Sequence, residues 1–126
     1  MGDQSIGSGA YNPLGLLLSL GAPPSAIGHA GEQIVVGHLQ RAGYSGNWDT
    51  RLAGSSDIEA WGGARHLLIQ VKSALYPNSP PYVSVTEERN IKARASRIGA
   101  EAWEARVQVG AMLAQLGEIG WRRLGP

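Results

Sequence analysis

Three side chains that can bind a metal ion or a phosphate fall on one face of a predicted β-hairpin. The stretch 57–72 has the pattern of two short strands around Gly62-Gly63, a dipeptide typical of hairpin turns. Strand side chains alternate with period two, so loops of two or of four residues both leave Asp57, Gln70 and Lys72 on one face. Only the four-residue loop places Asp57 directly opposite Gln70, and a three-residue loop would separate the set.

The chemistry these residues offer is that of a hard metal ion beside a phosphate. Oxygen ligands such as those of Asp57 and Gln70 suit Mg²⁺ or Mn²⁺. Lys72, on the same predicted strand, can hold a water molecule or stabilise negative charge on a phosphate. Glu32 is a fourth candidate, because it borders the apolar stripe of a predicted helix and can reach the sheet. Polar groups on a buried face cost free energy unless they are paired or coordinate an ion.

Helices and strands on both sides of the hairpin must hold this face in place. The expected elements, in order, are a helix from its N-cap Ser25 to about Ala42, a weak strand Trp48–Ala53, the hairpin strands Asp57–Trp61 and His66–Lys72, a helix capped by Thr86 and closed by Gly99, an alternating strand Trp103–Val109 and a last short strand Gly120–Leu124. In the alternating strand, apolar side chains share one face and Glu104, Arg106 and Gln108 the other. This order predicts an α/β fold with a mixed central β-sheet flanked by helices.

The chain divides into an expected N-terminal extension, residues 1–24, and a folded domain, residues 25–126. Within the extension, Pro13–Leu20 can form a short apolar helix that ends at Gly21 and the helix breaker Pro23-Pro24. Such a helix should pack on the domain or on a second subunit.

Composition and charge exclude several classes of protein. With 126 residues, of which 43% are hydrophobic and 17% charged, the chain suffices for one folded domain. The net charge of +1 gives no global positive field, so any nucleic-acid surface must be a local patch. The absence of cysteine excludes disulfides, a cysteine zinc site and a thiol nucleophile. No apolar run is long enough to span a bilayer, so we expect a soluble, cytoplasmic protein without a membrane partner.

Several short segments together resemble a known family. They are Gly31-Glu32, Gly43-Tyr44, Gly54-Ser55-Ser56-Asp57-Ile58 and Ile69-Gln70-Val71-Lys72-Ser73. In this order they resemble the PD-(D/E)xK nuclease superfamily, and the size and order of the elements are most similar to archaeal-type Holliday junction resolvases. The resemblance implies a restriction-endonuclease-like fold and an Mg²⁺-dependent endonuclease of DNA recombination and repair, with Mn²⁺ as a substitute metal. It further implies a homodimer that hydrolyses phosphodiester bonds in branched DNA, the four-way Holliday junction.

The resemblance also implies a role for each matching residue. It makes Asp57 the central metal ligand, Gln70 the occupant of the second acidic position, Lys72 the catalytic lysine, Glu32 the additional helix acid, Ser55 or Ser56 the loop serine near the scissile phosphate, and Arg51 a basic residue that touches DNA. The sequence departs from the family pattern at two places. Ser56 replaces the proline before the aspartate, and Gln70 replaces a glutamate or aspartate. A glutamine can ligate Mg²⁺ but carries no charge, which predicts weaker metal binding.

The second predicted helix carries a row of basic side chains, namely Arg89, Lys92, Arg94 and Arg97. They could lie along DNA phosphates and give salt-sensitive, sequence-independent affinity, or they could form an ordinary solvated helix face. The tryptophans at 61, 103 and 121 are expected to be core or dimer-interface anchors rather than stacking platforms for bases. Two alternatives to junction resolution stay open: another nuclease of this fold that cuts linear or damaged DNA, and a catalytically silent junction-binding module.

Overall fold

The structure is a computed structural model that describes residues 21–48 and 57–126. The described elements, in chain order, are α2 (Pro24–Arg41), β1 (Ser45–Asn47), β2 (Asp57–Gly62), β3 (Arg65–Leu75), α3 (Val85–Ile98), β4 (Glu101–Val109), the short 3₁₀ helix η2 (Ala111–Leu113) and β5 (Gln115–Gly125). The predicted apolar helix at 13–20, and with it most of the predicted extension, lies outside these residues. No helix of the described chain combines the length and apolar character needed to cross a bilayer.

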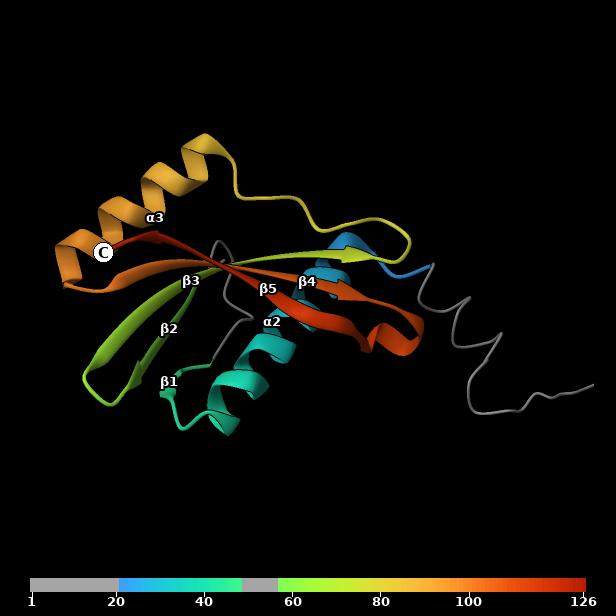
Figure 1. Ribbon diagram of the computed structural model, residues 1–126. Coiled ribbons are helices and arrows are strands. Elements are labelled where there is room, and N and C mark those ends of the chain that lie inside the picture. The colour runs from blue at the N-terminus through green and yellow to red at the C-terminus, as the bar shows by residue number, and fades with distance from the viewer. Residues whose placement is uncertain (1–20, 49–56) are drawn as a thin grey trace, which may run out of the picture.

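A five-stranded mixed sheet, in the order β1-β2-β3-β4-β5, forms the centre of the described chain. β3 and β4 are parallel, and the other neighbouring strands are antiparallel. The two long helices lie on opposite faces of the sheet, with α3 above it and α2 below it in Figure 1. α3 forms the crossover between the parallel strands, which such a connection requires. The predicted α/β fold with a flanked mixed sheet is therefore confirmed.

Each face of the sheet has its own apolar core because side chains alternate along the strands. α2 contributes Val35 and Leu39 to a core that includes Ile69 and Val71 of β3. α3 contributes Ile91 to a second core that includes Leu68 of β3. Side chains at even positions of β3 therefore lie on the face that α3 covers, which is the face of Gln70 and Lys72.

The two helices begin at residues other than those the sequence predicted. α3 begins at N-cap Ser84, not Thr86, since the Ser84 side chain accepts a hydrogen bond from the Glu87 amide. α2 begins after Pro23, which has no side-chain cap, and Pro24 is its first residue. Proline is well suited to this position because its fixed φ matches the helix and its missing N–H would be unpaired there anyway. The predicted N-cap Ser25 therefore lies inside α2.

The first and last strands also differ from the prediction. β1 spans Ser45–Asn47 and ends before Trp48, whereas 49–53 of the predicted strand lie outside the described residues. The chain reverses early because Gly43 adopts a positive φ of 92°, a conformation that suits glycine. β5 spans Gln115–Gly125 and is longer than the predicted 120–124. The additional residues of β5 pair with β4 through backbone hydrogen bonds at the edge of the sheet. Such pairing does not require an alternating apolar pattern, so the sequence gives no signal for it.

The β2–β3 hairpin has the register of the longer predicted loop. Gly62 pairs with Arg65 and Asp57 pairs with Gln70, and Gly63 takes a positive φ of 59° in the turn. Asp57 therefore stands opposite Gln70, as the four-residue alternative predicted, but the loop itself consists of only two residues, Gly63 and Ala64, because Gly62 and Arg65 are already paired. The turn thus sets which residue of β2 meets Gln70 across the ladder.

Candidate active site

A row of polar residues crosses the sheet beneath the start of α3. Asp57 of β2 pairs with Gln70 of β3, Gln70 pairs with Glu104 of β4, and Glu104 pairs with Arg122 of β5. Residues directly opposite one another in a ladder share a face, so the row belongs to the α3 side of the sheet. Lys72 shares this face with Gln70, as the sequence predicted.

Lys72 is held by an acidic residue of the neighbouring helix. Its Nζ donates to Oε2 of Glu87 at 2.7 Å, and the two side chains are 22% and 37% exposed. Gln70 is only 5% exposed. The lysine and the amide therefore lie at a boundary between the sheet and α3 that solvent reaches from the Lys72–Glu87 side.

Glu87 is fixed in place by the start of its own helix. The Ser84 amide donates to Glu87 Oε1 at 2.9 Å, and the Glu87 amide donates to Ser84 Oγ at 3.1 Å, which is a complete capping box. The hydrogen bond from Lys72, followed by that from the Ser84 amide, lowers the pKa of Glu87. The side chain is consequently a preoriented, ionised carboxylate. The prediction of Thr86 as the helix cap missed this orientation of Glu87, for which the Ser-x-x-Glu spacing is a readable sequence signal.

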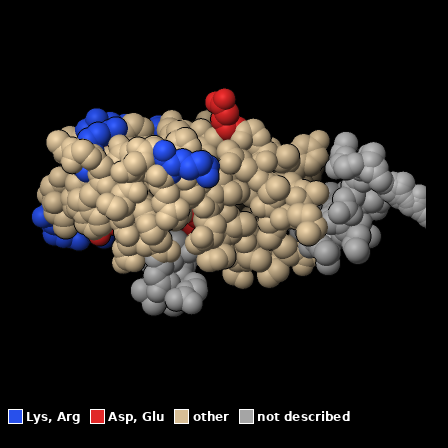
Figure 2. All heavy atoms as spheres, turned by 90° about the horizontal axis from the view of Figure 1, so that it is seen from below, with Lys and Arg blue, Asp and Glu red and all other residues tan. Residues whose placement is uncertain are grey.

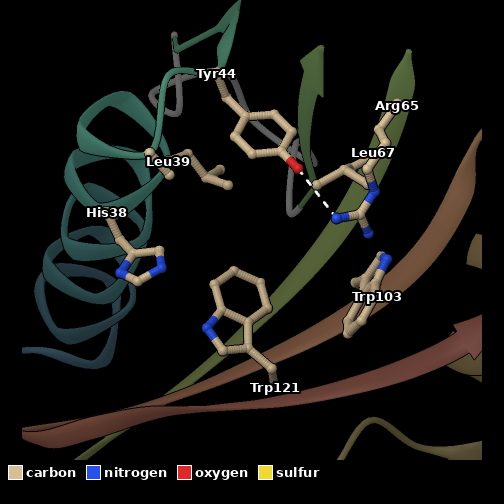
Figure 3. Close-up of a pocket in the computed structure, with 8 residues that line it drawn as sticks. His38, Leu39, Tyr44, Arg65, Leu67, Trp103 and Trp121 are labelled. Carbon is tan, nitrogen blue, oxygen red and sulfur yellow. Dashed lines mark hydrogen bonds between the residues drawn. The ribbon is translucent and has the colours of Figure 1, made fainter. Parts of the chain in front are cut away.

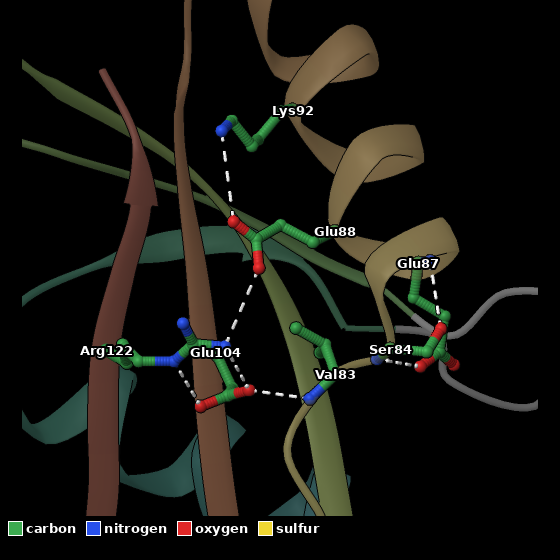
Figure 4. Close-up of polar contacts among 7 residues, drawn as sticks. All are labelled: Val83, Ser84, Glu87, Glu88, Lys92, Glu104 and Arg122. Atoms are coloured by element: carbon green, nitrogen blue, oxygen red, sulfur yellow. Dashed lines mark hydrogen bonds and ion pairs between the residues drawn. The ribbon is translucent and has the colours of Figure 1, made fainter.

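The row continues into an ion pair between the fully buried carboxylate of Glu104 and the part-exposed guanidinium of Arg122 (Figure 4). Glu104 is 0% exposed and accepts from Arg122 Nε at 3.0 Å and Nη2 at 3.1 Å. Its Oε2 also accepts from the Val83 amide at 2.7 Å. Burial raises the pKa of Glu104, but the hydrogen bonds from Arg122 and Val83 outweigh it and the net pKa is lowered. The predicted alternation of β4 is confirmed for its apolar face, whereas the polar face is not all solvent-exposed.

The connection between β3 and α3 contacts two arginines of the sheet, Arg106 of β4 and Arg122 of β5. Arg106 Nε donates to the Pro80 carbonyl at 3.1 Å, and its guanidinium lies 3.9 Å from the ring centroid of Tyr82. Arg122 lies 5.5 Å from the same centroid, a distance typical of a cation–π contact. Because Val83 directly precedes Ser84, these contacts fix the start of α3 and with it Glu87.

The other predicted site residues are not brought onto this face. Glu32 lies on α2, on the opposite side of the sheet, in a half-buried position. Its neighbour Gly31 packs so closely on β3 that an added Cβ would lie 1.8 Å from Ser73 Oγ, which places this part of α2 next to the residue that follows Lys72. The roles predicted for Glu32 and for the side chain of Asp57 stay predictions. Arg51, Ser55 and Ser56 lie outside the described residues.

The donor chemistry of the row fits a hard divalent cation. Asp57 and Gln70 are paired in the register of β2 and β3, and the carboxylate of Glu87 lies beside Lys72. Oxygen donors of this kind suit Mg²⁺ or Mn²⁺. Among the described residues, no three His, Asp or Glu side chains gather into a metal-binding group.

The basic residues of α3 divide between its outer surface and its flanks. Arg89 and Arg97 are exposed, and Arg94 is half-buried. Lys92 is exposed and lies 3.8 Å from Glu88. The outer face of α3 therefore presents Arg89 and Arg97 to solvent on the same side of the sheet as Lys72.

An aromatic pocket of about 260 Å³ lies on the opposite side, between α2 and the sheet (Figure 3). Trp103 and Trp121 meet edge to face in its wall with centroids 6.2 Å apart, and Arg65 donates to the Tyr44 hydroxyl at 3.3 Å. Both tryptophans pack against the apolar core, as predicted. Trp61 does not: it is 44% exposed and stacks on the hairpin residue His66, because it faces away from α2 and beyond the reach of α3. The pocket contains none of the predicted site residues.

The fold is α/β and restriction-endonuclease-like, with a mixed central sheet flanked by helices. A solved structure with a similar fold is that of Archaeoglobus fulgidus Hjc, a Holliday junction resolvase from an archaeal hyperthermophile. The two share 29% sequence identity with a TM-score of 0.54, over 78% of this chain and 71% of that one. No family model matches the sequence, and no curated protein matches it.

Proposed function

We propose that this protein is a metal-dependent, structure-selective DNA endonuclease that resolves four-way junctions by phosphodiester hydrolysis. One observation carries the proposal. The register sets Asp57 opposite Gln70 with Lys72 on the same face, in a fold similar to that of a Holliday junction resolvase. An oxygen-donor pair beside a lysine is the combination that metal-assisted phosphoryl chemistry needs.

Asp57 and Gln70 are the proposed ligands of Mg²⁺, for which Mn²⁺ can substitute. Glu32 belongs to α2, on the opposite side of the sheet, and is not counted as a ligand of this ion. A bound divalent ion supplies polarisation of the scissile phosphate and activation of the attacking water. The Lys72 ammonium stabilises the negative charge that develops on the phosphate. The bond from Lys72 to Glu87 supports this role, because it keeps the ammonium on the Gln70 face of the sheet.

DNA would approach the α3 side of the sheet. The proposed contacts are Arg51, Ser55 and Ser56 before β2, together with Arg89, Lys92, Arg94 and Arg97 of α3. The exposure of Arg89 and Arg97 on the side of Lys72 supports this direction of approach. Arginine contacts to phosphates give affinity without sequence preference, which suits an enzyme that recognises DNA shape.

Symmetric cutting of a junction requires two active sites, and therefore a homodimer of this chain. The face seen in Figure 2, on which α2 lies, carries its Lys and Arg side chains in the half away from the N-terminal trace and is largely uncharged elsewhere. We place the dimer contact on this face, with the tryptophan pocket and residues 1–24 as its candidates. Light scattering on the full chain and on a variant lacking residues 1–24 tests this: an unchanged dimer would exclude the segment.

A cleavage assay tests the function directly. A labelled four-way junction and a linear duplex of the same sequence are incubated with Mg²⁺ and either the wild type or Asp57→Asn. Gln115→Glu, a change at the far end of β5, is the control for an altered charge elsewhere. We expect paired nicks near the crossover with the wild type and the control, no nicks with Asp57→Asn, and an intact duplex.

Each other result leads to a different function. Equal cleavage of junction and duplex would retain the metal-dependent nuclease and remove junction selectivity. Tight junction binding without cleavage in either Mg²⁺ or Mn²⁺ would make the protein a silent junction-binding module. Unchanged cleavage by Asp57→Asn would remove Asp57 from the active site.

A further inference from the structure

The proposed metal site lacks one negative charge at the position of Gln70. Gln70 is directly opposite Asp57 and is 5% exposed, so its amide can offer an oxygen but no charge to an ion there. A divalent cation bound by a single carboxylate and a neutral amide is held weakly, because affinity in oxygen-donor sites follows the charge of the ligands. A second carboxylate on the same face would correct this deficit.

The acidic side chains that the structure describes on this face have different partners. Glu59 is bonded to His66 at 2.7 Å, at the hairpin end of the sheet. Glu104 is fully buried and bonded to Arg122, and Glu88 lies between Arg122 and Lys92 at 3.7 and 3.8 Å. Glu87 is the one bonded to Lys72, at 2.7 Å.

Glu87 has three properties of a metal ligand. Its carboxylate is ionised, since the contact with Lys72 and the Ser84 amide favours the charged form. It is preoriented by the capping box, which leaves Oε2 directed at Lys72 while Oε1 accepts from the Ser84 amide. It is also 37% exposed, so a hydrated ion can reach it. The buried Glu104 carboxylate fixes the preceding Val83 amide at 2.7 Å, which limits movement of the whole helix start.

We propose that Glu87 supplies the carboxylate that Gln70 lacks, so that Asp57, Gln70 and Glu87 together hold the divalent cation beside Lys72. The inference rests on the proposed metal-dependent nuclease function. In it, Glu87 in the first turn of α3 provides the negative charge that an acidic residue at the position of Gln70 would otherwise provide. The ion pair between Lys72 and Glu87 then represents the metal-free arrangement. In that arrangement the Lys72 ammonium balances the charge of the Glu87 carboxylate, which would bind the metal ion when the ion is present.

Glu87→Gln is a selective test because it removes the charge and keeps the shape. Glutamine also serves at this position of a capping box, so the hydrogen bond to the Ser84 amide and the start of α3 are retained. Glu88→Gln is the matched control, since Glu88 is in the same helical turn but contacts Lys92 and Arg122. Thermal unfolding of both variants reports whether each one is folded.

Binding of Mn²⁺, followed by the electron paramagnetic resonance signal of the free ion, is the readout. It is measured on the full-length chain with a four-way junction made cleavage-resistant by phosphorothioate linkages at the crossover. We expect Glu87→Gln to weaken Mn²⁺ binding about tenfold or more and Glu88→Gln to leave it unchanged. The double variant Gln70→Glu/Glu87→Gln, which returns the charge to the other position, should restore binding.

Two results would overturn the inference. If Glu87→Gln binds Mn²⁺ like the wild type while Asp57→Asn does not, the proposed function stands and Glu87 only orients Lys72. If Gln70→Glu/Glu87→Gln remains as weak as Glu87→Gln, the two positions do not serve the same ion. The proposed function fails separately, when neither the wild type nor Asp57→Asn binds Mn²⁺ with the junction present.

Discussion

Gln70 of β3 lies directly across the ladder from Glu104 of β4, and both side chains are buried. They are the two central members of the polar row that runs from Asp57 to Arg122 across the sheet. Glu104 is bonded to Arg122 and to the Val83 amide, and its charge holds the start of α3. Gln70 is paired in the ladder with Asp57 and brings no charge of its own. The row therefore places a structural ion pair next to a candidate site. Both contact the start of α3: the ion pair through the Val83 amide, and the candidate site through the bond from Lys72 to Glu87.

Loss of Arg122 should destabilise the fold strongly. Arg122→Met leaves the buried Glu104 carboxylate with the hydrogen bond from the Val83 amide, at 2.7 Å, but without its guanidinium partner. An uncompensated buried charge costs about 3 kcal/mol or more. Urea unfolding at pH 7 measures the change. Arg123→Met is the control, because Arg123 is 50% exposed and lies 3.7 Å from Glu101, so its loss should cost about 1 kcal/mol or less. Equal losses would contradict a special role for Arg122 as the partner of the buried Glu104 carboxylate.

Glu101 should make stability depend on pH in the acid range. The hydrogen bond from Arg65, above all, lowers the pKa of Glu101 from 4.5 to about 2. As pH falls below 4.5 the unfolded chain takes up this proton first, so the contribution of Glu101 to stability is fully present above pH 4.5 and is lost toward pH 2. The free energy of unfolding, measured by urea at pH 5 and pH 3, should fall more for the wild type than for Glu101→Gln. Identical differences would rule out this group as the source.

The hairpin could be predicted from sequence because its signals are local. The Gly62-Gly63 dipeptide indicated a hairpin, and the period-two alternation of strand side chains placed Gln70 and Lys72 on one face. Only the structure shows which residue of β2 is paired with Gln70. The burial of Glu104 could not be predicted in the same way, since an alternating polar residue is normally solvent-exposed and this one is covered by Val83 and Arg122. Those contacts join residues 18 or more positions apart in the chain.

The start of α3 is an intermediate case, and it can be tested. Two candidate caps lie two positions apart, and the capping box selects Ser84 over Thr86. Ser84→Ala should therefore destabilise the protein by about 1 kcal/mol, while Thr86→Ala, at an exposed position inside the helix, should change it by less than about 0.5 kcal/mol. Thermal unfolding of the two variants gives the comparison. The reverse order would restore Thr86 as the cap.

Binding of junction DNA should depend on salt through the outer face of α3. Replacing both Arg89 and Arg97 with alanine removes two exposed cations from this face, and each lost phosphate contact lowers the slope of log K against log salt by about 1. Fluorescence anisotropy between low and moderate salt measures the slope. Arg41→Ala, at the end of α2 on the other side of the sheet, should leave it unchanged. A slope that changes equally in both variants would show that DNA does not approach from the α3 side.

Two glycines of α2 should respond oppositely to the same substitution. An added Cβ at Gly31 would lie 1.8 Å from Ser73 Oγ and 2.9 Å from Ser73 Cβ, whereas one at Gly28 meets nothing within 4 Å. Gly28→Ala should stabilise the helix by up to about 1 kcal/mol, as expected for a helical site with open space for the added methyl group. Gly31→Ala should destabilise the protein by about 1–3 kcal/mol, since β3 or the helix must move apart.

Urea unfolding separates these outcomes, and the cleavage assay adds a functional consequence. Ser73 directly follows Lys72, so a displacement of β3 at Ser73 should also slow cleavage by Gly31→Ala at a temperature where the variant is fully folded. The double variant Gly31→Ala/Ser73→Gly removes the colliding side chain and should recover both properties in part. If Gly31→Ala proves as stable as Gly28→Ala, α2 does not approach β3 this closely, and Gly31 has no part in positioning the strand that carries Lys72.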